Sequence, residues 1–290
     1  MKTLTYLIAL LAVSFALVAP AHAEPWKFSL DASIMLNQSG YSDNWSGGEA
    51  GTVVWVSNIN GTAEKQLHPK LLNKNTLKLA FGQTHKQQRE TDTWDHPEKS
   101  TDLIDFESTF RVTLGSVVEP IVAFRALSQF VDYNDPAQKE YFNPAVLTET
   151  VGIARAFIKE EKREFITRLT AGVRQNIDRN RVDPAPTVEH DAGFEFVADI
   201  KTLLADDRIE YTGKLSVFQD LYYSESDRFK GLPEENYWKS PDINWENIFT
   251  ATITKYLMVN LYTQLLYDKQ IDKGGRFKQT LSLGLTYKFI

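Results

Sequence analysis

Long segments in which apolar and polar residues alternate constrain the fold of this chain more than any other feature. Along residues 26–37, alternate positions carry apolar side chains, and the residues between them are almost all polar. Similar alternation occurs in the segments 104–114, 194–201, 209–217 and 281–289. Because successive side chains of a β-strand point to opposite faces, each segment predicts a strand with one apolar and one polar face.

The length and the charges of these segments favour a membrane barrel over a soluble sheet. Several segments exceed the roughly 5–6 residues of a usual soluble strand and match the roughly 9–11 residues of a tilted membrane strand. Their polar faces include charged residues such as Asp105, Glu107 and Arg111. A core that is apolar on both sides would not accommodate these charges, whereas a wall between lipid and a polar lumen would.

We therefore predict an all-β fold, a transmembrane antiparallel up-and-down β-barrel of about twelve strands. Long polar connections alternate with tight turns along most of the chain, as in bacterial barrels, so both the N- and the C-terminus are expected in the periplasm. The connection from Glu64 to Asn73 is longer than this rule expects, and the one from Asp268 to Gly275 is shorter. The predicted strands cover residues 26–37, 51–63, 74–84, 102–114, 120–131, 146–158, 164–175, 193–203, 208–221, 242–254, 256–266 and 276–290.

The first residues of the chain predict export. Lys2 precedes an apolar run that ends at Pro20, and the triplet Ala21–Ala23 has small residues at both positions that a signal peptidase reads. This pattern is typical of a signal peptide that is cleaved after the triplet. The expected organisation is a cleaved signal peptide at 1–23 and an outer-membrane β-barrel domain at 24–290, in a Gram-negative bacterium.

Composition excludes several classes of function and partner. The net charge is −6, with 32 basic and 38 acidic residues, so nucleic acid is not an expected partner. The chain has no cysteine, which excludes disulfides, thiol catalysis and cysteine-based metal sites. The expected partners are outer-membrane lipids, the barrel-insertion machinery and periplasmic chaperones. The alternating final strand ends with the aromatic residues Tyr287 and Phe289, which form the predicted membrane-insertion signal.

No catalytic residue, metal site or cofactor is predicted. Asp95 and His96 could form a metal site on a loop, but they lack ligand spacing that is specific to a metal, and a solvated loop is favoured. A lipid hydrolase would need a serine and a histidine within hydrogen-bonding distance. His85 and Ser100 are the nearest candidates for that pair, and no Gly-x-Ser-x-Gly motif occurs.

The polar faces of the predicted strands would line the lumen, and their charges nearly balance. A selective pore usually carries a ring of charges of one sign. A balanced set instead indicates ion pairs across the lumen, with either a narrow, weakly selective path for small solutes or a packed interior, and the packed interior is slightly favoured. The lumen-facing candidates are Asp31, Lys78, Asp105, Glu107, Arg111, Arg125, Arg168, Arg174, Glu195, Asp199, Lys214 and Glu246.

Short motifs in a fixed order resemble those of a known family. In order, they are Asn44–Glu49, Lys99–Asp102, Ser128–Phe130, Asn143–Thr148, Leu266–Asp268 and Tyr287–Phe289. They are similar to the landmarks of the domain of unknown function family numbered 3078, common in Bacteroidota-like bacteria, over nearly the whole mature chain. This chain departs from the family at Ser128, Val146 and the trailing Ile290, where threonine, tyrosine and no further residue are usual. The resemblance implies location and fold, and it assigns no catalytic residue.

The expected function is that of a non-enzymatic outer-membrane barrel. Its role would be structural, or the handling of a small solute or a lipid through a lumen with balanced charge. One alternative is an outer-membrane lipid hydrolase, and another is a soluble periplasmic β-rich binding protein.

Overall fold

The structure, a computed structural model, describes residues 25–42, 50–88, 90–133, 139–160, 162–179 and 187–289. The predicted signal peptide and the Asn44–Glu49 motif lie outside the described residues, as does Ile290. Within the described part of the chain, twelve strands close into one barrel in which every neighbouring pair is antiparallel. The predicted fold class and strand number are therefore confirmed.

The barrel strands follow one another around the wall in chain order, and β14 closes on β1. A separate two-stranded sheet, β6 (Val131–Asp132) with β7 (Glu140–Tyr141), interrupts the connection after the fifth barrel strand. The barrel strands are β1 (Lys27–Ser39), β2 (Thr52–His68), β3 (Leu71–Lys86), β4 (Glu98–Val112), β5 (Glu119–Ser128), β8 (Ala145–Lys159), β9 (Arg163–Asp178), β10 (Thr187–Leu204), β11 (Ile209–Tyr223), β12 (Asp242–Thr252), β13 (Leu257–Tyr267) and β14 (Arg276–Lys288).

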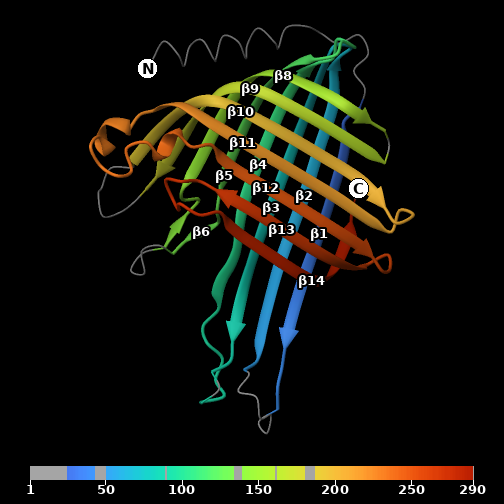
Figure 1. Cartoon of the computed structure of the whole chain (residues 1–290). Coiled ribbons are helices and arrows are strands. Elements are labelled where there is room, and N and C mark those ends of the chain that lie inside the picture. Colours follow the sequence, from blue (N-terminus) through green and yellow to red (C-terminus); the bar gives the residue numbers. More distant parts are fainter. Residues whose placement is uncertain are drawn as a thin grey trace.

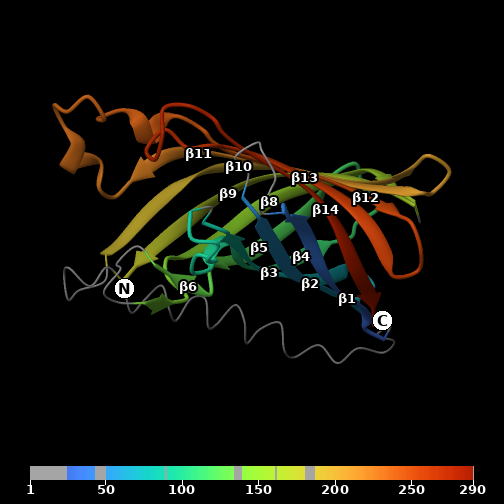
Figure 2. The same cartoon turned by 90° about the horizontal axis from the view of Figure 1, so that it is seen from below.

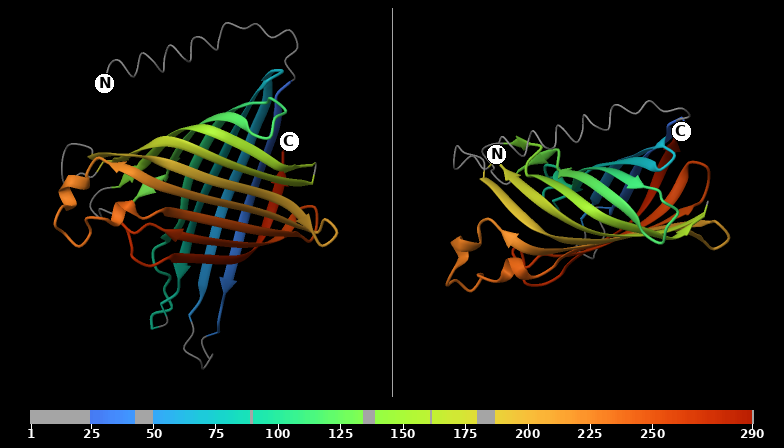
Figure 3. Two further views of the ribbon diagram at one scale, coloured as in Figure 1. Left: turned by 45° about the horizontal axis from the view of Figure 1, so that its top comes forward. Right: turned by 90° about the horizontal axis from the view of Figure 1, so that it is seen from above.

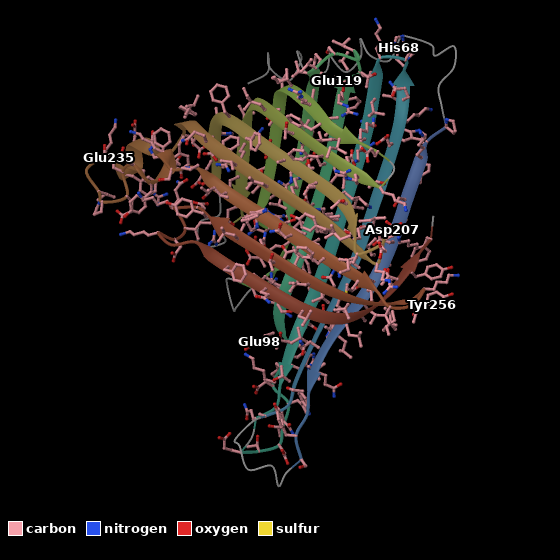
Figure 4. The ribbon with its side chains drawn as sticks, turned by 45° about the vertical axis from the view of Figure 1, so that its right-hand side comes forward. His68, Glu98, Glu119, Asp207, Glu235 and Tyr256 are labelled. Atoms are coloured by element: carbon pink, nitrogen blue, oxygen red, sulfur yellow. The ribbon has the colours of Figure 1, made fainter. Side chains whose placement is uncertain are left out.

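Short and long connections alternate strictly, which defines a turn end and a loop end of the barrel. Figure 4 labels His68, Glu119, Asp207 and Tyr256 at the turn end. The loop end, which includes Glu98, carries the longer connections. Among these, the one between β11 and β12 contains the short 3-10 helices η2 (Ser226–Phe229) and η3 (Tyr237–Lys239).

Several predicted strand boundaries differ from those in the structure, for different physical reasons. The long connection predicted at Glu64–Asn73 does not exist, because β2 continues to His68 and only two residues separate it from β3. Its polar residues keep pairing, with Glu64 opposite Lys74. The predicted strand 120–131 ends instead at Ser128, because the backbone N–H groups of Phe130 and Val131 donate to the Asp102 carboxylate rather than to a strand.

One face of the barrel sheet is apolar and exposed, as a lipid-facing wall would be. Most strands contribute exposed apolar residues to it, and directly paired residues extend the apolar surface from strand to strand, as Ile34 does with Leu285. Its exposed members include Phe28, Ile34, Leu36, Val122, Val151, Leu169, Phe194, Phe196, Trp245, Leu281, Leu283 and Leu285.

No helix within the described residues is long and apolar enough to cross a membrane.

Two groups of strands form opposite walls of the barrel. In Figure 1, β1–β4 are steeply inclined and lie behind β9–β13, which slope across them. Strands on opposite sides of a barrel cross because all of them tilt relative to its axis. Figure 2 and Figure 3 show the two groups facing each other across the interior, so residues far apart in the sequence can meet there.

Two glycines allow neighbouring strands to approach closely on the loop-end side of one wall. Gly172 and Gly193 are directly paired between β9 and β10, next to an irregularity of register at Ala192. A Cβ atom on Gly193 would lie 2.0 Å from the backbone oxygen of Gln219, and one on Gly172 would lie 2.4 Å from that of Glu149. The close approach of neighbouring strands at these two positions therefore requires residues without side chains.

Candidate functional site in the barrel interior

Ion pairs between strands that are not neighbours identify the interior face of the sheet. Lys78 on β3 lies 3.7 Å from the Glu246 carboxylate on β12, and Glu107 on β4 contacts Arg168 on β9. None of these strands adjoin in the barrel, so each contact must cross the interior. Pairing then places residues directly opposite these side chains, such as Asp105 opposite Lys78, on the same interior face.

Glu107 joins the two walls of the barrel. One of its carboxylate oxygens accepts from Arg168 Nη1 at 2.5 Å, and the other accepts from Lys214 Nζ at 3.0 Å. Arg168 also lies 3.6 Å from Asp199 through its other terminal nitrogen. The side chains of Glu107, Arg168 and Lys214 are largely buried, so water screens these charges less than it does at a surface.

A second pair lies beside Glu107. Arg125 on β5 donates from Nε and Nη2 to the two oxygens of Asp105 at 2.8 and 2.9 Å, the bidentate geometry that strengthens arginine–carboxylate pairs. Register places Arg125 directly opposite Glu107, and Lys214 directly opposite Glu246. We call the resulting contiguous group the central ion-pair cluster; its members are Lys78, Asp105, Glu107, Arg125, Arg168, Asp199, Lys214 and Glu246.

The eight members of the central ion-pair cluster balance one another, since four cations face four carboxylates, and Glu195 adds a negative charge near Arg125 and Arg168. Its contacts from β4 to β9 and β11, and from β3 to β12, cross the interior near mid-strand. Removing one partner of such a buried pair leaves an uncompensated charge, which costs more than the intact pair contributes. The arrangement therefore links the two walls of the barrel through paired charges.

A second group of charges lies toward the loop end and is acidic. Arg174 on β9 contacts three aspartates on β10, β11 and β12, with Nη1 2.7 Å from Asp242 and Nη2 3.2 Å from both Asp191 and Asp220. The guanidinium also lies 4.1 Å from the centre of the Phe218 ring. One cation thus contacts three carboxylates, so this group has an excess of negative charge, unlike the central ion-pair cluster.

The remaining lumen-facing candidates make their direct contacts outside both groups, although Glu195 lies close enough to Arg125 and Arg168 of the central ion-pair cluster to interact with them electrostatically. Arg111 Nε is 3.3 Å from Glu119, and Asp31 accepts from Asn60 Nδ2 at 3.1 Å. Glu195 accepts from the hydroxyl of Ser216 at 3.3 Å. These contacts join neighbouring strands only, so they line one wall without bridging to the other.

Sequence reasoning missed several interior charges, among them Asp191, Asp242 and Lys278. Asp191 precedes the predicted strand 193–203, and the structure starts β10 earlier, at Thr187. Asp242 and Lys278 lie inside predicted strands. The alternation could have placed them on the interior face, because Asp242 shares a face with Glu246, and Lys278 shares one with Thr280. Lys278 Nζ reaches across to β4, 3.4 Å from the Ser100 carbonyl oxygen and 3.3 Å from Thr101 Oγ1.

The described residues give no geometric support for a hydrolase. His85 pairs with Val53 and lies beyond the last residue pair that joins β3 to β4. Ser100 lies several residues away, at the irregularity between Gly82 and Gln83, and no hydrogen bond joins it to His85. Asp95 accepts from Gln88 Nε2 at 2.6 Å, and in the described ranges no group of three or more His, Cys, Asp or Glu residues is arranged so that it could hold a metal ion.

The aromatic residues near the C-terminus lie at the turn end. Tyr287 is on the exposed face of β14, and its ring stacks 6.4 Å from that of Tyr256. Phe289 follows the strand, its backbone N–H donates to Leu30 at 2.9 Å, and its ring meets Tyr287 edge-on. The role of these residues as a membrane-insertion signal stays a prediction.

Together, the fold and the interior define a closed, twelve-stranded antiparallel barrel with an apolar exterior and a charged interior, the class to which outer-membrane barrels belong. The family described as Protein of unknown function (DUF3078) matches residues 36–133. The chain therefore resembles this family as expected, over a shorter stretch than the motifs suggest. The match includes the first three motifs and ends before Asn143.

Solved structures that are similar to the chain are outer-membrane barrels of low sequence identity. An outer membrane channel from Pseudomonas putida F1 is 12% identical, with 93% of this chain and 98% of that chain covered and a TM-score of 0.44. The NanC porin is 9% identical, with 89% and 98% covered and a TM-score of 0.40. The translocator domain of the autotransporter NalP from Neisseria meningitidis is 10% identical, with 99% and 96% covered and a TM-score of 0.38. A search of curated proteins finds no match.

Proposed function

We propose that this chain is an outer-membrane barrel whose interior is held closed at rest by the central ion-pair cluster. The observation that carries the proposal is the bridge from Glu107 on one wall to Arg168 and Lys214 on the other. A balanced set of paired charges disfavours a strongly selective open pore. The barrel would admit small solutes or lipids only when the two walls separate.

Location in the outer membrane is part of this proposal. It is supported by the exposed apolar face of the sheet, because an exterior of this kind is stable in lipid and not in water. The proposal also includes export of the chain through a signal peptide at residues 1–23. Fractionation of cells that express the full chain tests both points: the protein should be in outer-membrane fractions, and its mass should correspond to a chain that starts at Glu24. Recovery of the chain from the soluble periplasm would contradict the proposal.

Conductance across a planar lipid bilayer tests the closed interior. The wild-type barrel should show rare, small steps, because the cluster blocks the path of ions. The substitution Glu107→Gln keeps the shape of the side chain but removes the charge that joins Arg168 and Lys214, so frequent larger steps are expected.

Glu210→Gln is the matched control for Glu107→Gln. Glu210 pairs with Lys201 at 3.2 Å between the neighbouring strands β10 and β11, so the substitution removes an interior charge without breaking a bridge between walls. This control should conduct as the wild type does. A large, steady conductance of the wild type, unchanged by Glu107→Gln, would show that the interior is an open pore and the proposal wrong.

A further inference from the structure

The barrel closes on itself through an incomplete seam between β1 and β14. The paired stretch runs from Asp31 opposite Lys288 to Leu36 opposite Leu283. This stretch lies on the turn-end side of the seam. Beyond that point, residues 276–282 of β14 pair with β13 but not with any described residue of β1. Residues 37–39 of β1 likewise pair with β2 alone. Figure 1 shows the two strands diverging toward the loop end.

Unpaired strand edges are costly where the surroundings are hydrocarbon. In lipid, a backbone N–H or C=O group without a partner costs several kcal/mol, which is why membrane barrels normally close completely. Within the described residues, one side-chain hydrogen bond links β1 to residues 276–282 of β14. Asn37 Nδ2 donates to the carbonyl oxygen of Leu281 at 3.2 Å. The edge is thus held at one position and is otherwise available.

The surface that flanks this edge is apolar. Phe277 and Leu281 on β14 are 66% and 57% exposed, and Leu36 on β1 is 47% exposed. Soluble proteins protect free edges with charged side chains and short strands, and neither device is present on this outer face. The apolar flank indicates that the unpaired edge lies at the depth of the lipid chains.

An ammonium group without a carboxylate partner lies on the interior side of the same strand segment. Lys278 contacts only the neutral oxygens of Ser100 and Thr101 among the described residues. In contrast, each cation of the central ion-pair cluster contacts at least one carboxylate. An anionic group could therefore bind Lys278 without displacing an existing ion pair.

We propose that the seam between β1 and β14 is a lateral passage for an amphiphile with a single apolar chain and an anionic head. The chain lies against Phe277, Leu281 and Leu36 on the lipid side, and the head, a carboxylate or a phosphate, enters between the strands and binds Lys278. This inference rests on the proposed location in the membrane. It names the class of molecule that the barrel handles.

Photo-crosslinking tests the passage directly. The full-length mature barrel is reconstituted in lipid vesicles that contain a diazirine-labelled dodecanoate, and the modified residues are identified by mass spectrometry. Labelling should concentrate on Phe277, Leu281 and Leu36. Labelling spread evenly over the exposed apolar residues of all strands would reflect bulk lipid and overturn the passage.

The role of Lys278 has its own measurement. Dodecanoate should bind the Lys278→Gln variant about tenfold or more weakly than the wild type, because a hydrogen bond to a charged group is worth roughly 1.5–3 kcal/mol. Lys201→Gln is the matched control, since Lys201 is an interior lysine that is paired with Glu210, and its affinity should not change. Equal affinity of the Lys278→Gln variant and the wild type would overturn the role of the lysine.

Different head groups identify the source of the anion. Dodecyl phosphate that binds better than dodecanoate would assign the site to phosphorylated lipids, and the reverse order would assign it to fatty acids. Binding of dodecyltrimethylammonium as strong as that of either anion would contradict the proposed head-group preference.

A cysteine pair locks the seam and separates this inference from the proposed function. The chain contains no cysteine, so Asn37→Cys with Ser282→Cys introduces one pair, at the positions that would follow Leu36 and Leu283 if the ladder continued. Crosslinking of dodecanoate should fall in the oxidised protein and return after reduction. Labelling that persists after oxidation would contradict the proposed passage. The conductance of the Glu107→Gln variant reports on the closed interior independently.

Discussion

At the scale of single residues, the sequence predicts which charged side chains lie on the interior face but not which of them form ion pairs. Alternation along one strand places Glu107 on the polar face, yet nothing local indicates that it reaches β9 and β11. Those contacts depend on how far the two walls approach each other, which is a property of the closed barrel. The same limit explains Lys278, whose β4 partners are more than 170 residues away in the chain.

The Asp105–Arg125 pair carries a prediction about stability. Arg125→Met should lower the free energy of unfolding by about 3 kcal/mol, because the Asp105 carboxylate is left buried without its bidentate partner. Adding Asp105→Leu to the same chain should recover most of the loss, since no charge is then left alone. Urea unfolding of the barrel in lipid vesicles measures both. A double variant that is as unstable as the single one would mean that shape, not charge, holds this position.

At the scale of elements, the strands were predictable and their ends were not. The alternation of apolar and polar residues is clear only inside the apolar band, so β2 and β10 extend past their predicted ends as polar strand. The β6–β7 sheet was not predicted, because it is organised by tertiary contacts. The buried amide of Asn143 donates to Asp132 and Asp178, two contacts that the motif Asn143–Thr148 does not reveal because its partners lie elsewhere in the chain.

Gly193 provides a test of how tightly two strands must approach. Gly193→Val should reduce the folded fraction of the barrel strongly, because its side chain would meet the backbone of Gln219 on β11. Gly40→Val is the control, since a Cβ atom at Gly40 has no neighbour within 4 Å. The difference in gel mobility between heated and unheated samples measures the folded fraction. Equal folding of the two variants would show that the wall at Gly193 can relax.

At the scale of the whole molecule, closure explains both the stability and the proposed activity of the barrel. The walls are linked across the interior by paired charges, whereas the seam between the first and last strands is paired along only part of its length. The sequence predicts a closed barrel, because alternation and connection lengths are local features. It does not predict where closure is incomplete, since that depends on the relative register of β1 and β14 at opposite ends of the chain.

The last strand allows assembly to be separated from stability. Phe289 lies past β14, is exposed, and contributes a backbone bond to Leu30 that any residue could make. If it is the residue that the insertion machinery recognises, Phe289→Ala should lower the amount of folded barrel in cells several-fold. The purified variant should nevertheless fold into lipid vesicles as fast as the wild type, because no machinery acts there. Phe28→Ala, which removes another exposed aromatic ring near the turn end, should leave both readouts unchanged. Equal losses in cells and in vesicles would instead assign Phe289 to the stability of the seam.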